Sequence, residues 1–271
     1  MNEFKYVIKS KIRFVSRMPK YFRYMKEHRF GLCSVCGRKS IFLAHQENTR
    51  ESLHCVYCNA WLRVRFHVEQ IIKTFSSEGS NSLAELVKEE HFLRLHIYSA
   101  QAQGSIHNVL KKCPNYTCSE YFDNIEPGKF YKGTRCEDLQ GLSFNDKEFD
   151  LVLHAAVLEH VRKPLLALKE TYRVLKDGGH SIFTIPMTDL CAKKLREKSI
   201  NRVDTSTEED IFILEPIYHG DPLRKEGALV YTDFGLDTID RLKEIGFGVE
   251  VKTMSLDNPL KNHIVVFICK K

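Results

Sequence analysis

The sequence lacks two features that would place it in or across a membrane. It has no apolar run approaching the roughly 18 residues that a transmembrane helix requires. Its first residues contain neither the apolar block nor the small-residue cleavage site of a secretory signal. We therefore expect a cytoplasmic protein, in which an apolar fraction of 43% over 271 residues allows one domain of ordinary size and a smaller module.

The chain has little net charge outside its first residues. The formal charge is +6, but residues 1–29 alone carry nine Lys or Arg against Glu3 and Glu27. Apolar residues recur three or four positions apart in this segment, which predicts a basic amphipathic helix over residues 1–30, with Pro19 as a point of interruption. Such a helix could contact an anionic membrane surface or the phosphates of RNA, or it could pack its apolar stripe on the rest of the chain.

The nine cysteines do not have the distribution of a disulfide framework. Four of them form two Cys-x-x-Cys pairs separated by 18 residues, and the others are scattered. The paired residues are Cys33, Cys36, Cys55 and Cys58. Two tight turns at this spacing can present four thiolates to one zinc ion, so we predict a small zinc ribbon over residues 31–66 with a closed, structural site. A zinc ion bound there would supply folding energy.

Three basic side chains follow the second cysteine pair. Arg63, Arg65 and His67 lie close in sequence to Trp61 and Phe66, and together they could form a small basic edge that stacks on the bases of RNA. Trp61 could equally belong to the core. RNA is therefore a partner that the sequence allows without requiring it.

The segment from Phe149 to Pro186 has the pattern of a strand, a helix and a second strand. An apolar run suited to a strand buried on both faces comes first, a polar loop follows, and apolar residues then recur at helical spacing. The pieces are the strand 149–153, the loop 154–163, the helix from Pro164 to a stop at Asp177-Gly178-Gly179, and the strand 181–185. Such a unit implies a parallel, right-handed crossover, with ligands bound at the carboxyl ends of its strands.

This unit resembles the second half of the class I S-adenosylmethionine-dependent methyltransferase domain, in which a strand beginning FD, a VLEH loop, a helix ending RVLK and a GG turn follow one another. Here the pieces are Phe149-Asp150, Val157–His160, Arg173–Lys176 and Gly178-Gly179. The order of parts also resembles a subgroup of these enzymes, in which a Cys-x-x-Cys ribbon with an arginine-rich end precedes the catalytic domain. The resemblance covers most of residues 31–271.

The resemblance implies an α/β fold with a Rossmann-like, doubly wound methyltransferase sheet over residues 91–271. A helical linker over residues 67–90 would join this domain to the zinc ribbon. The end of the chain agrees with such a fold. Residues 237–244 have a helical pattern, and the apolar residues at 249–251 and 264–268 suit a closing antiparallel pair at the sheet edge.

The resemblance also implies S-adenosylmethionine as the cofactor, bound by the loop after a first strand predicted at 92–98. This loop has a single glycine where the common pattern is glycine-rich, although its small side chains still permit close approach of the backbone. A helix over residues 105–111 would direct its first N–H groups at the cofactor carboxylate. The departure from the pattern leaves open a domain that has lost the cofactor and acts as a non-catalytic adaptor. The candidate binding residues of the loop are Ser99, Ala100, Gln101 and Gly104.

Two acids are candidates for the nucleoside part of the cofactor. Glu120 ends the second predicted strand, where the family places an acid that accepts protons from both ribose hydroxyls, and Asp123 is the alternative. Asp138 would accept from the adenine amino group while the backbone N–H of Leu139 meets a ring nitrogen, and Glu137 is the alternative. Each acid could instead stabilise a turn.

The loop after the fourth predicted strand would border the transferred methyl group. His154 and Ala155 would form its floor, and His160 of the VLEH element would organise the loop in the cofactor site. Candidate bases are His154, His219 and Asp221. The last two lie in a long insertion expected to form the acceptor lid, where they could equally stabilise a turn.

The acceptor itself has no clear signature. A His-Ala-Ala-Val segment at 154–157 replaces the Asn-Pro-Pro-aromatic motif of many amino-group methyltransferases, which argues mildly against DNA or glutamine methylation. Glu159, in the same loop, is expected to cap the following helix or to face water. We expect a small-molecule or sugar-containing acceptor. The alternatives are an RNA methyltransferase that uses the ribbon and the basic N-terminus, and the non-catalytic adaptor.

Overall fold

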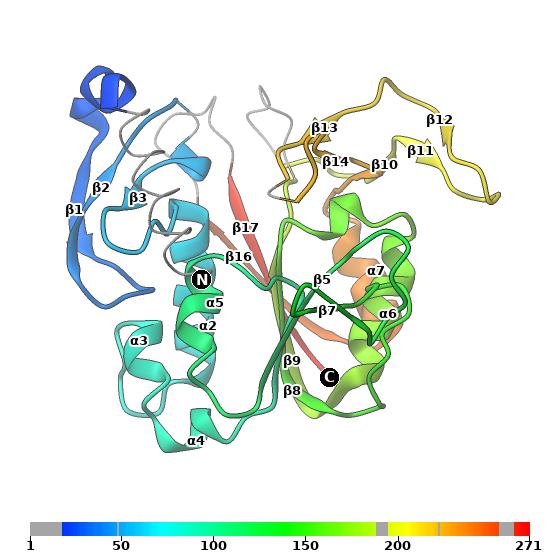
Figure 1. Ribbon diagram of the computed structural model, residues 1–271, viewed down its shortest axis with the longest axis horizontal. Coiled ribbons are helices and arrows are strands. Elements are labelled where there is room, and N and C mark those ends of the chain that lie inside the picture. The colour runs from blue at the N-terminus through cyan, green and yellow to red at the C-terminus, as the bar shows by residue number, and fades with distance from the viewer. Residues whose placement is uncertain (1–17, 48, 188–194, 222, 255–262) are drawn as a thin grey trace.

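The computed structural model describes residues 18–47, 49–187, 195–221, 223–254 and 263–271. An eight-stranded sheet forms its centre and carries helices on both faces (Figure 1). In spatial order the strands are β16 (Gly248–Met254), β17 (Ile264–Lys270), β9 (Leu175–Thr184), β8 (Phe149–Ala155), β4 (Ile97–Ser99), β5 (Tyr116–Glu120), β7 (Thr134–Cys136) and β6 (Phe130–Tyr131).

The inner part of the sheet is parallel and doubly wound. From β4 the chain passes through α5 (Ser105–Leu110) to β5 on one side, and it later forms β8 and β9 on the other side, joined by α6 (Pro164–Val174). The strand order therefore reverses between β4 and β8. The sheet closes with α7 (Thr238–Ile245) and with β17, which lies antiparallel between β9 and β16. This arrangement confirms the predicted Rossmann-like sheet and creates a crevice at the carboxyl ends of β4 and β8.

Alternate side chains of the central strands enter two separate cores. Leu151 and Leu153 face the core on the side of α5, whereas Val152 and Tyr98 face the core on the side of α6 and α7. The first side is also covered by α2 (Leu62–Phe75), α3 (Leu83–Leu86) and α4 (Glu90–Leu93). None of the helices that the structure describes is long and apolar enough to cross a membrane.

The predicted ribbon is a three-stranded antiparallel sheet of β1 (Arg29–Leu32), β2 (Lys39–Leu43) and β3 (His54–Cys55). Its buried Val35, Phe42 and Leu53 belong to the same hydrophobic core as α2 and the central sheet. The ribbon is therefore continuous with the first face of the sheet.

Two predicted segment boundaries differ from the structure. The strand β1 begins before residue 31, and α2 begins inside the segment predicted as ribbon. Of the predicted N-terminal helix, residues 18–23 are helical and include Pro19, and η1 (Met25–Glu27) follows. Residues 1–17, which carry most of that prediction, lie outside the described residues.

The insertion between β9 and α7 forms three short antiparallel pairs. It lies at one end of the central sheet (Figure 1), and it reaches η3 (Leu158–His160) through the bond from Tyr231 N–H to the Glu159 carbonyl, 2.8 Å. The pairs are β10 (Ile200–Asn201) with β15 (Thr232–Asp233), β11 (Val203–Asp204) with β12 (Ile211–Phe212), and β13 (Tyr218–His219) with β14 (Ala228–Leu229).

Two predicted elements have different bounds because tertiary packing overrides the local pattern. The predicted strand at 92–98 is reduced to β4, since Phe92 belongs to α4 and packs its ring against Phe75 of α2 with 5.9 Å between centroids. The helix α6 ends at Val174 because Leu175 is extended and pairs with Phe149. The predicted stop at 177–179 therefore lies within β9.

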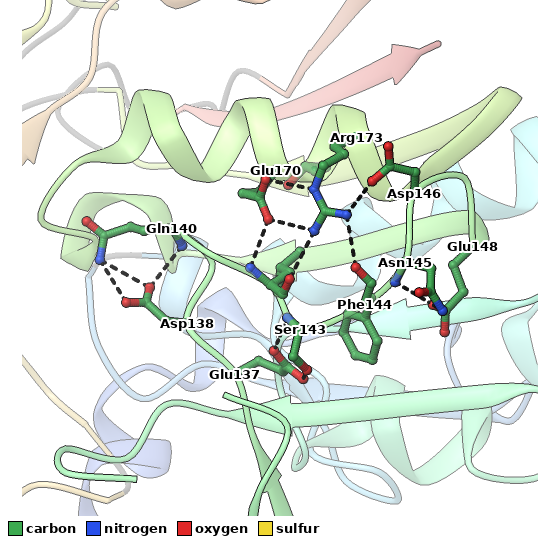
Figure 2. A network of polar contacts seen from close by, with 12 residues as sticks. Glu137, Asp138, Gln140, Ser143, Phe144, Asn145, Asp146, Glu148, Glu170 and Arg173 are labelled. Atoms are coloured by element: carbon green, nitrogen blue, oxygen red, sulfur yellow. Dashed lines mark hydrogen bonds and ion pairs between the residues drawn. The ribbon is translucent and has the colours of Figure 1, made fainter. Parts of the chain in front are cut away.

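Arg173 near the end of α6 connects that helix to the loop before β8 (Figure 2). Its guanidinium donates to both carboxylate oxygens of Glu170 at 2.8 Å and to Asp146 at 2.6 Å. It also donates to the carbonyls of Leu142 and Phe144, each at 2.9 Å. The planar fork of arginine suits this set of acceptors, so the loop that leads from β7 to β8 is held in place.

We predict that Arg173→Lys lowers the free energy of unfolding by about 1–3 kcal/mol. An ammonium group cannot donate at the same time to the two carbonyls and to the carboxylates of Glu170 and Asp146. Urea denaturation followed by circular dichroism measures this. Lys147→Met is the control, since its ion pair with Asp177 is exposed and should contribute much less to stability. Equal losses in the two variants would contradict the assigned role of Arg173.

Candidate active site at the carboxyl edge of the sheet

A small hollow opens between the carboxyl ends of β4 and β8. The Ser99 hydroxyl donates to the Gln101 carbonyl at 3.1 Å, and Ala100 N–H donates to the Leu153 carbonyl at 3.0 Å, so the loop after β4 is held against β8. Three of the predicted site residues therefore meet in one hollow: Ser99 at the end of β4, Gln101 in the loop after it, and His154 in β8. Its lining comprises His67, Ser99, Gln101, Gln103, Ile106, His107, Leu153 and His154.

The loop after β4 turns at Gly104, whose φ of +95° favours glycine, immediately before α5. The same loop is held by Glu120, because its carboxylate accepts from Ala102 N–H at 3.0 Å. Burial raises the pKa of Glu120 despite that bond. The competing Asp123 has a 66% exposed side chain that lies 3.5 Å from Arg224. Glu120, and not Asp123, thus faces the predicted cofactor loop.

Asp138 and Glu137 have different surroundings (Figure 2). The Glu137 side chain is buried and accepts from Arg135 at 2.7 Å and from the Ser143 hydroxyl at 2.6 Å, so it stabilises its own loop. Asp138 is half-buried and accepts from the N–H and the side chain of Gln140. Cys136 of β7 pairs with Glu120 of β5, and Asp138 follows Cys136 by two residues. Both predicted acids therefore lie at the same edge of the sheet. Leu139 is buried beside it.

His154 forms part of the hollow and is itself 1% exposed. Its ring stacks on Phe183 with 4.5 Å between centroids, and neither ring nitrogen has a hydrogen-bond partner. Burial, together with the nearby His67, lowers its pKa to about 3. A general base needs a pKa close to the working pH, so His154 fits the predicted floor of the site and not the predicted base.

The strand β8 ends at Ala155, and the chain then reverses at Ala156, whose φ is +54°. A left-handed conformation is unfavourable for alanine, and such strain often occurs at functional sites. Ala156 N–H donates to the Thr184 carbonyl at 2.8 Å, which fixes the turn against the end of β9. The turn directs η3 across the carboxyl edge.

Glu159 in η3 does not cap a helix or face water, as the sequence led us to expect. Its side chain is 1% exposed, and neither carboxylate oxygen has a hydrogen bond. Its Oε1 lies 3.8 Å from His160 Nε2 and 4.0 Å from His219 Nδ1. Burial raises the pKa of Glu159 and lowers those of both histidines. His160 thus belongs to a carboxylate–imidazole cluster that also contains His219.

Asp221 has a different environment from His219, although both lie in the predicted lid. Its carboxylate accepts from Leu223 N–H at 2.6 Å and from the Arg224 guanidinium at 2.8 Å. Burial opposes ionisation, but these bonds keep the pKa of Asp221 below its usual value. Asp221 therefore stabilises the turn, which was the alternative to a catalytic role. Arg224 also donates to the Tyr121 carbonyl at 3.4 Å, so the insertion contacts the loop after β5.

The ribbon contributes a charged cluster to this edge that sequence reasoning missed. Glu51 accepts from Arg63 at 2.7 and 3.3 Å and lies 3.4 Å from Arg50. Burial opposes ionisation of Glu51, but the two guanidiniums hold its pKa below the usual value. Arg63 Nη1 also reaches Thr184 Oγ1 at the end of β9, 3.5 Å away. The cluster could not be predicted from the charges of these residues or from their spacing in the sequence. Glu51 contacts Arg63 only because η2 (Thr49–Glu51) packs against α2.

The predicted basic edge beside the ribbon is wrong. Arg65 is 6% exposed and lies over the Phe42 ring, and His67 is buried with its Nε2 2.9 Å from the Ile182 carbonyl. Arg63 is engaged by Glu51. These side chains belong to the inner face of α2, which packs on the sheet, so they do not form a surface for nucleic acid.

The four paired cysteines meet at one point of the ribbon. The Sγ atoms of Cys33 and Cys58 are 3.6 Å apart, those of Cys36 and Cys55 are 3.8 Å apart, and all four lie within 4.8 Å of one another. Each pair closes a similar turn, in which the N–H of the residue after the second cysteine donates to the carbonyl of the first. None of these four thiols forms a disulfide.

Comparison with known proteins agrees with this architecture. A family model described as a methyltransferase domain matches residues 103–183, which extend from the loop after β4 to the end of β9. No curated protein matches the chain significantly.

Several solved structures are similar to the chain. An S-adenosylmethionine-dependent methyltransferase from Mesorhizobium loti is 15% identical, with 72% of this chain and 99% of that chain covered and a TM-score of 0.43. The 1,6-didemethyltoxoflavin-N1-methyltransferase from Burkholderia thailandensis is 14% identical, with 78% and 87% covered and a TM-score of 0.39. Both TM-scores are below 0.5, and the similarity to a methyltransferase domain therefore rests on the matched residues 103–183.

Residues 103–183 match a methyltransferase domain, and the doubly wound sheet that contains them has the strand order of the Rossmann-like methyltransferase fold. Together these findings support S-adenosylmethionine-dependent methyl transfer as the activity.

The buried imidazoles make stability depend on pH. Burial lowers the pKa of His154 to about 3 and that of His67 to about 4, against 6.5 for an unperturbed histidine, so the unfolded chain binds more protons than the folded chain below pH 6.5. Stability therefore falls as the pH falls through this value. We predict that His154→Phe makes the decline shallower, by an amount approaching about 1.4 kcal/mol per pH unit.

Urea unfolding at several values between pH 7.5 and 5 tests this prediction. The exposed His96 supplies the control, and His96→Gln should decline with pH as steeply as the wild type does. Parallel curves for the His154→Phe variant and the wild type would show that His154 is protonated in the folded state.

Proposed function

We propose that this enzyme transfers a methyl group from S-adenosylmethionine to a hydroxyl group of a small molecule or of a sugar-containing intermediate. The observation that carries the proposal is the hollow between β4 and β8, where the two nitrogens of His154 are buried without partners. Buried polar atoms are normally paired, so unpartnered ones in the wall of a hollow suit a polar ligand. Glu120 lies against the loop that borders the same hollow.

The residues at this edge fit the cofactor. Ser99, Ala100, Gln101 and Gly104 would border its amino-acid part, Glu120 its ribose, and Asp138 with the Leu139 N–H its adenine. His154 and Ala155 would form the floor, and His160 would hold the loop through its Nδ1 contact with the Leu229 carbonyl, 2.8 Å. When bound, the cofactor supplies an electrophilic methyl group.

With a cavity volume of about 20 Å³ the hollow holds little more than one water molecule, far less than the roughly 300–1,000 Å³ of typical ligand pockets. Binding would therefore require the side chains of Gln101 and Gln103, which line it, to move aside.

The acceptor would lie beneath the insertion, beside η3. Methyl transfer depends mainly on alignment of the acceptor atom, so its positioning groups matter more than a nucleophile. Of the three predicted bases, His154 is buried and Asp221 is engaged by Arg224, which leaves His219 placed to contact the acceptor. The charged groups of Glu51 and Arg63 at the end of β9 favour a hydroxylated acceptor over an apolar one. An RNA acceptor would have to contact exposed basic residues of the ribbon such as Arg38, whose guanidinium lies over the exposed Tyr57 ring, or residues 1–17, which lie outside the described residues.

We further propose that the four cysteines hold a structural zinc ion. A tetrahedral ion about 2.3 Å from each sulfur separates neighbouring sulfurs by about 3.8 Å, and the two measured separations are 3.6 and 3.8 Å. A site closed by four thiolates has no open position for a substrate. Because the ribbon shares its core with α2, the ion would stabilise the wall that carries Glu51 and Arg63.

Glu120→Gln should weaken binding of S-adenosylmethionine by about tenfold to a hundredfold, because a neutral amide offers one acceptor oxygen where the carboxylate offers two. Isothermal titration calorimetry measures this, with Asp123→Asn as a control that should bind as the wild type does. Release of S-adenosylhomocysteine in a screen of hydroxylated acceptors tests the reaction. A wild-type protein that binds no cofactor would refute the proposed function.

Cys36→Ser should remove one equivalent of bound zinc and lower the melting temperature by on the order of 10 °C or more, since a structural zinc site contributes directly to folding. Elemental analysis of the purified chain gives the zinc content, expected at one ion per four-cysteine site. Cys118→Ser is the matched control, because Cys118 lies in β5 and away from the ribbon. A Cys36→Ser variant with the same zinc content as the wild type would show that the cysteines hold no ion.

A further inference from the structure

The cluster of Glu159, His160 and His219 has the composition of a metal site. One carboxylate oxygen and two imidazole nitrogens lie within 4.8 Å of one another. They come from η3 and from β13 of the insertion, which are far apart in the sequence. Two histidines and one carboxylate bind zinc and iron in many proteins and leave coordination positions open.

The carboxylate of Glu159 lacks a partner of its own. It is 1% exposed, and both of its oxygens are without a hydrogen bond. The guanidiniums of Arg50 and Arg63 attract the Glu159 carboxylate through space, but both of them pair directly with Glu51. Among the described residues no Lys or Arg nitrogen forms a direct ion pair with Glu159. A cation bound by this carboxylate would supply the direct contact that the two arginines do not.

His160 has the tautomer that metal binding requires. Its Nδ1 lies 2.8 Å from the Leu229 carbonyl, and since a carbonyl only accepts, Nδ1 carries the hydrogen. In the neutral ring the lone pair is then on Nε2, the atom that faces Glu159 at 3.8 Å. Metal-bound histidines commonly donate their other N–H to a backbone carbonyl in this manner.

The distances are close to those of a loaded site. A metal ion about 2.1 Å from each ligand atom separates these atoms by roughly 3.0–3.5 Å. The measured separations from Glu159 Oε1 are 3.8 Å to His160 and 4.0 Å to His219. His219 has a 45% exposed side chain and can approach by the required few tenths of an ångström.

We propose that Glu159, His160 and His219 bind one divalent transition-metal ion, with zinc as the ion best matched to two imidazoles and a carboxylate. The ion would occupy a site separate from the four cysteines and would keep at least one open position. If the proposed function is correct, an oxygen atom of the acceptor could take that position, and the metal would favour acceptors with a hydroxyl group. The metal site itself does not depend on that function.

Zinc binding by the full chain tests the proposal. Chain stripped of metal is titrated with Zn²⁺ in a calorimeter, and the wild type should bind one equivalent more than the cysteine site accounts for. His219→Ala and Glu159→Gln should each weaken that equivalent by tenfold or more, whereas Cys36→Ser should leave it intact. Circular dichroism of each variant verifies that it is folded.

His96→Ala is the matched control, because this exposed histidine lies before β4, outside the cluster. It should bind zinc as the wild type does. The proposal is overturned if the wild type has no equivalent beyond the cysteine site. It is also overturned if that equivalent survives unchanged in both the His219→Ala and the Glu159→Gln variants.

Discussion

Burial of both faces of the five parallel strands is the constraint on which the rest of the structure depends. A parallel sheet is stable when layers of helix and loop exclude water from each face. Here α6 and α7 cover one face, and α2 to α5 cover the other together with the ribbon. The central strands β4 and β8 can then be apolar on both sides, and only their carboxyl ends remain available for chemistry.

The ribbon is part of this covering layer as well as a candidate zinc site. Its Phe42 packs beneath the Arg65 guanidinium, and its short helix η2 places Glu51 beside Arg63 at the end of β9. The arginines that follow the second cysteine pair are therefore used inside the protein. A zinc ion in the ribbon would act on catalysis only indirectly, by keeping this wall in position.

The insertion decides which polar groups are buried at the carboxyl edge. It lies over η3, and its Leu229 carbonyl accepts a hydrogen bond from His160. It also places His219 beside Glu159. Arg224 of the insertion also donates a hydrogen bond to the Tyr121 carbonyl in the loop after β5. The proposed cofactor side of the edge, built by β4, β5 and β7, is thus separate from the proposed acceptor side, where the insertion meets η3.

The doubly wound sheet, the grouping of the four cysteines and the position of Glu120 at a strand end could be predicted from the amino-acid sequence. These features follow from local patterns: an apolar strand, a repeated Cys-x-x-Cys spacing, and an acid at the end of a strand. The burial of Glu159 became visible only in the folded chain, because it depends on the insertion. The same holds for the turn that engages Asp221 and for the position of Arg65 over Phe42. Each of these depends on a segment distant in sequence, and local pattern carries no information about which side chains such a segment will cover.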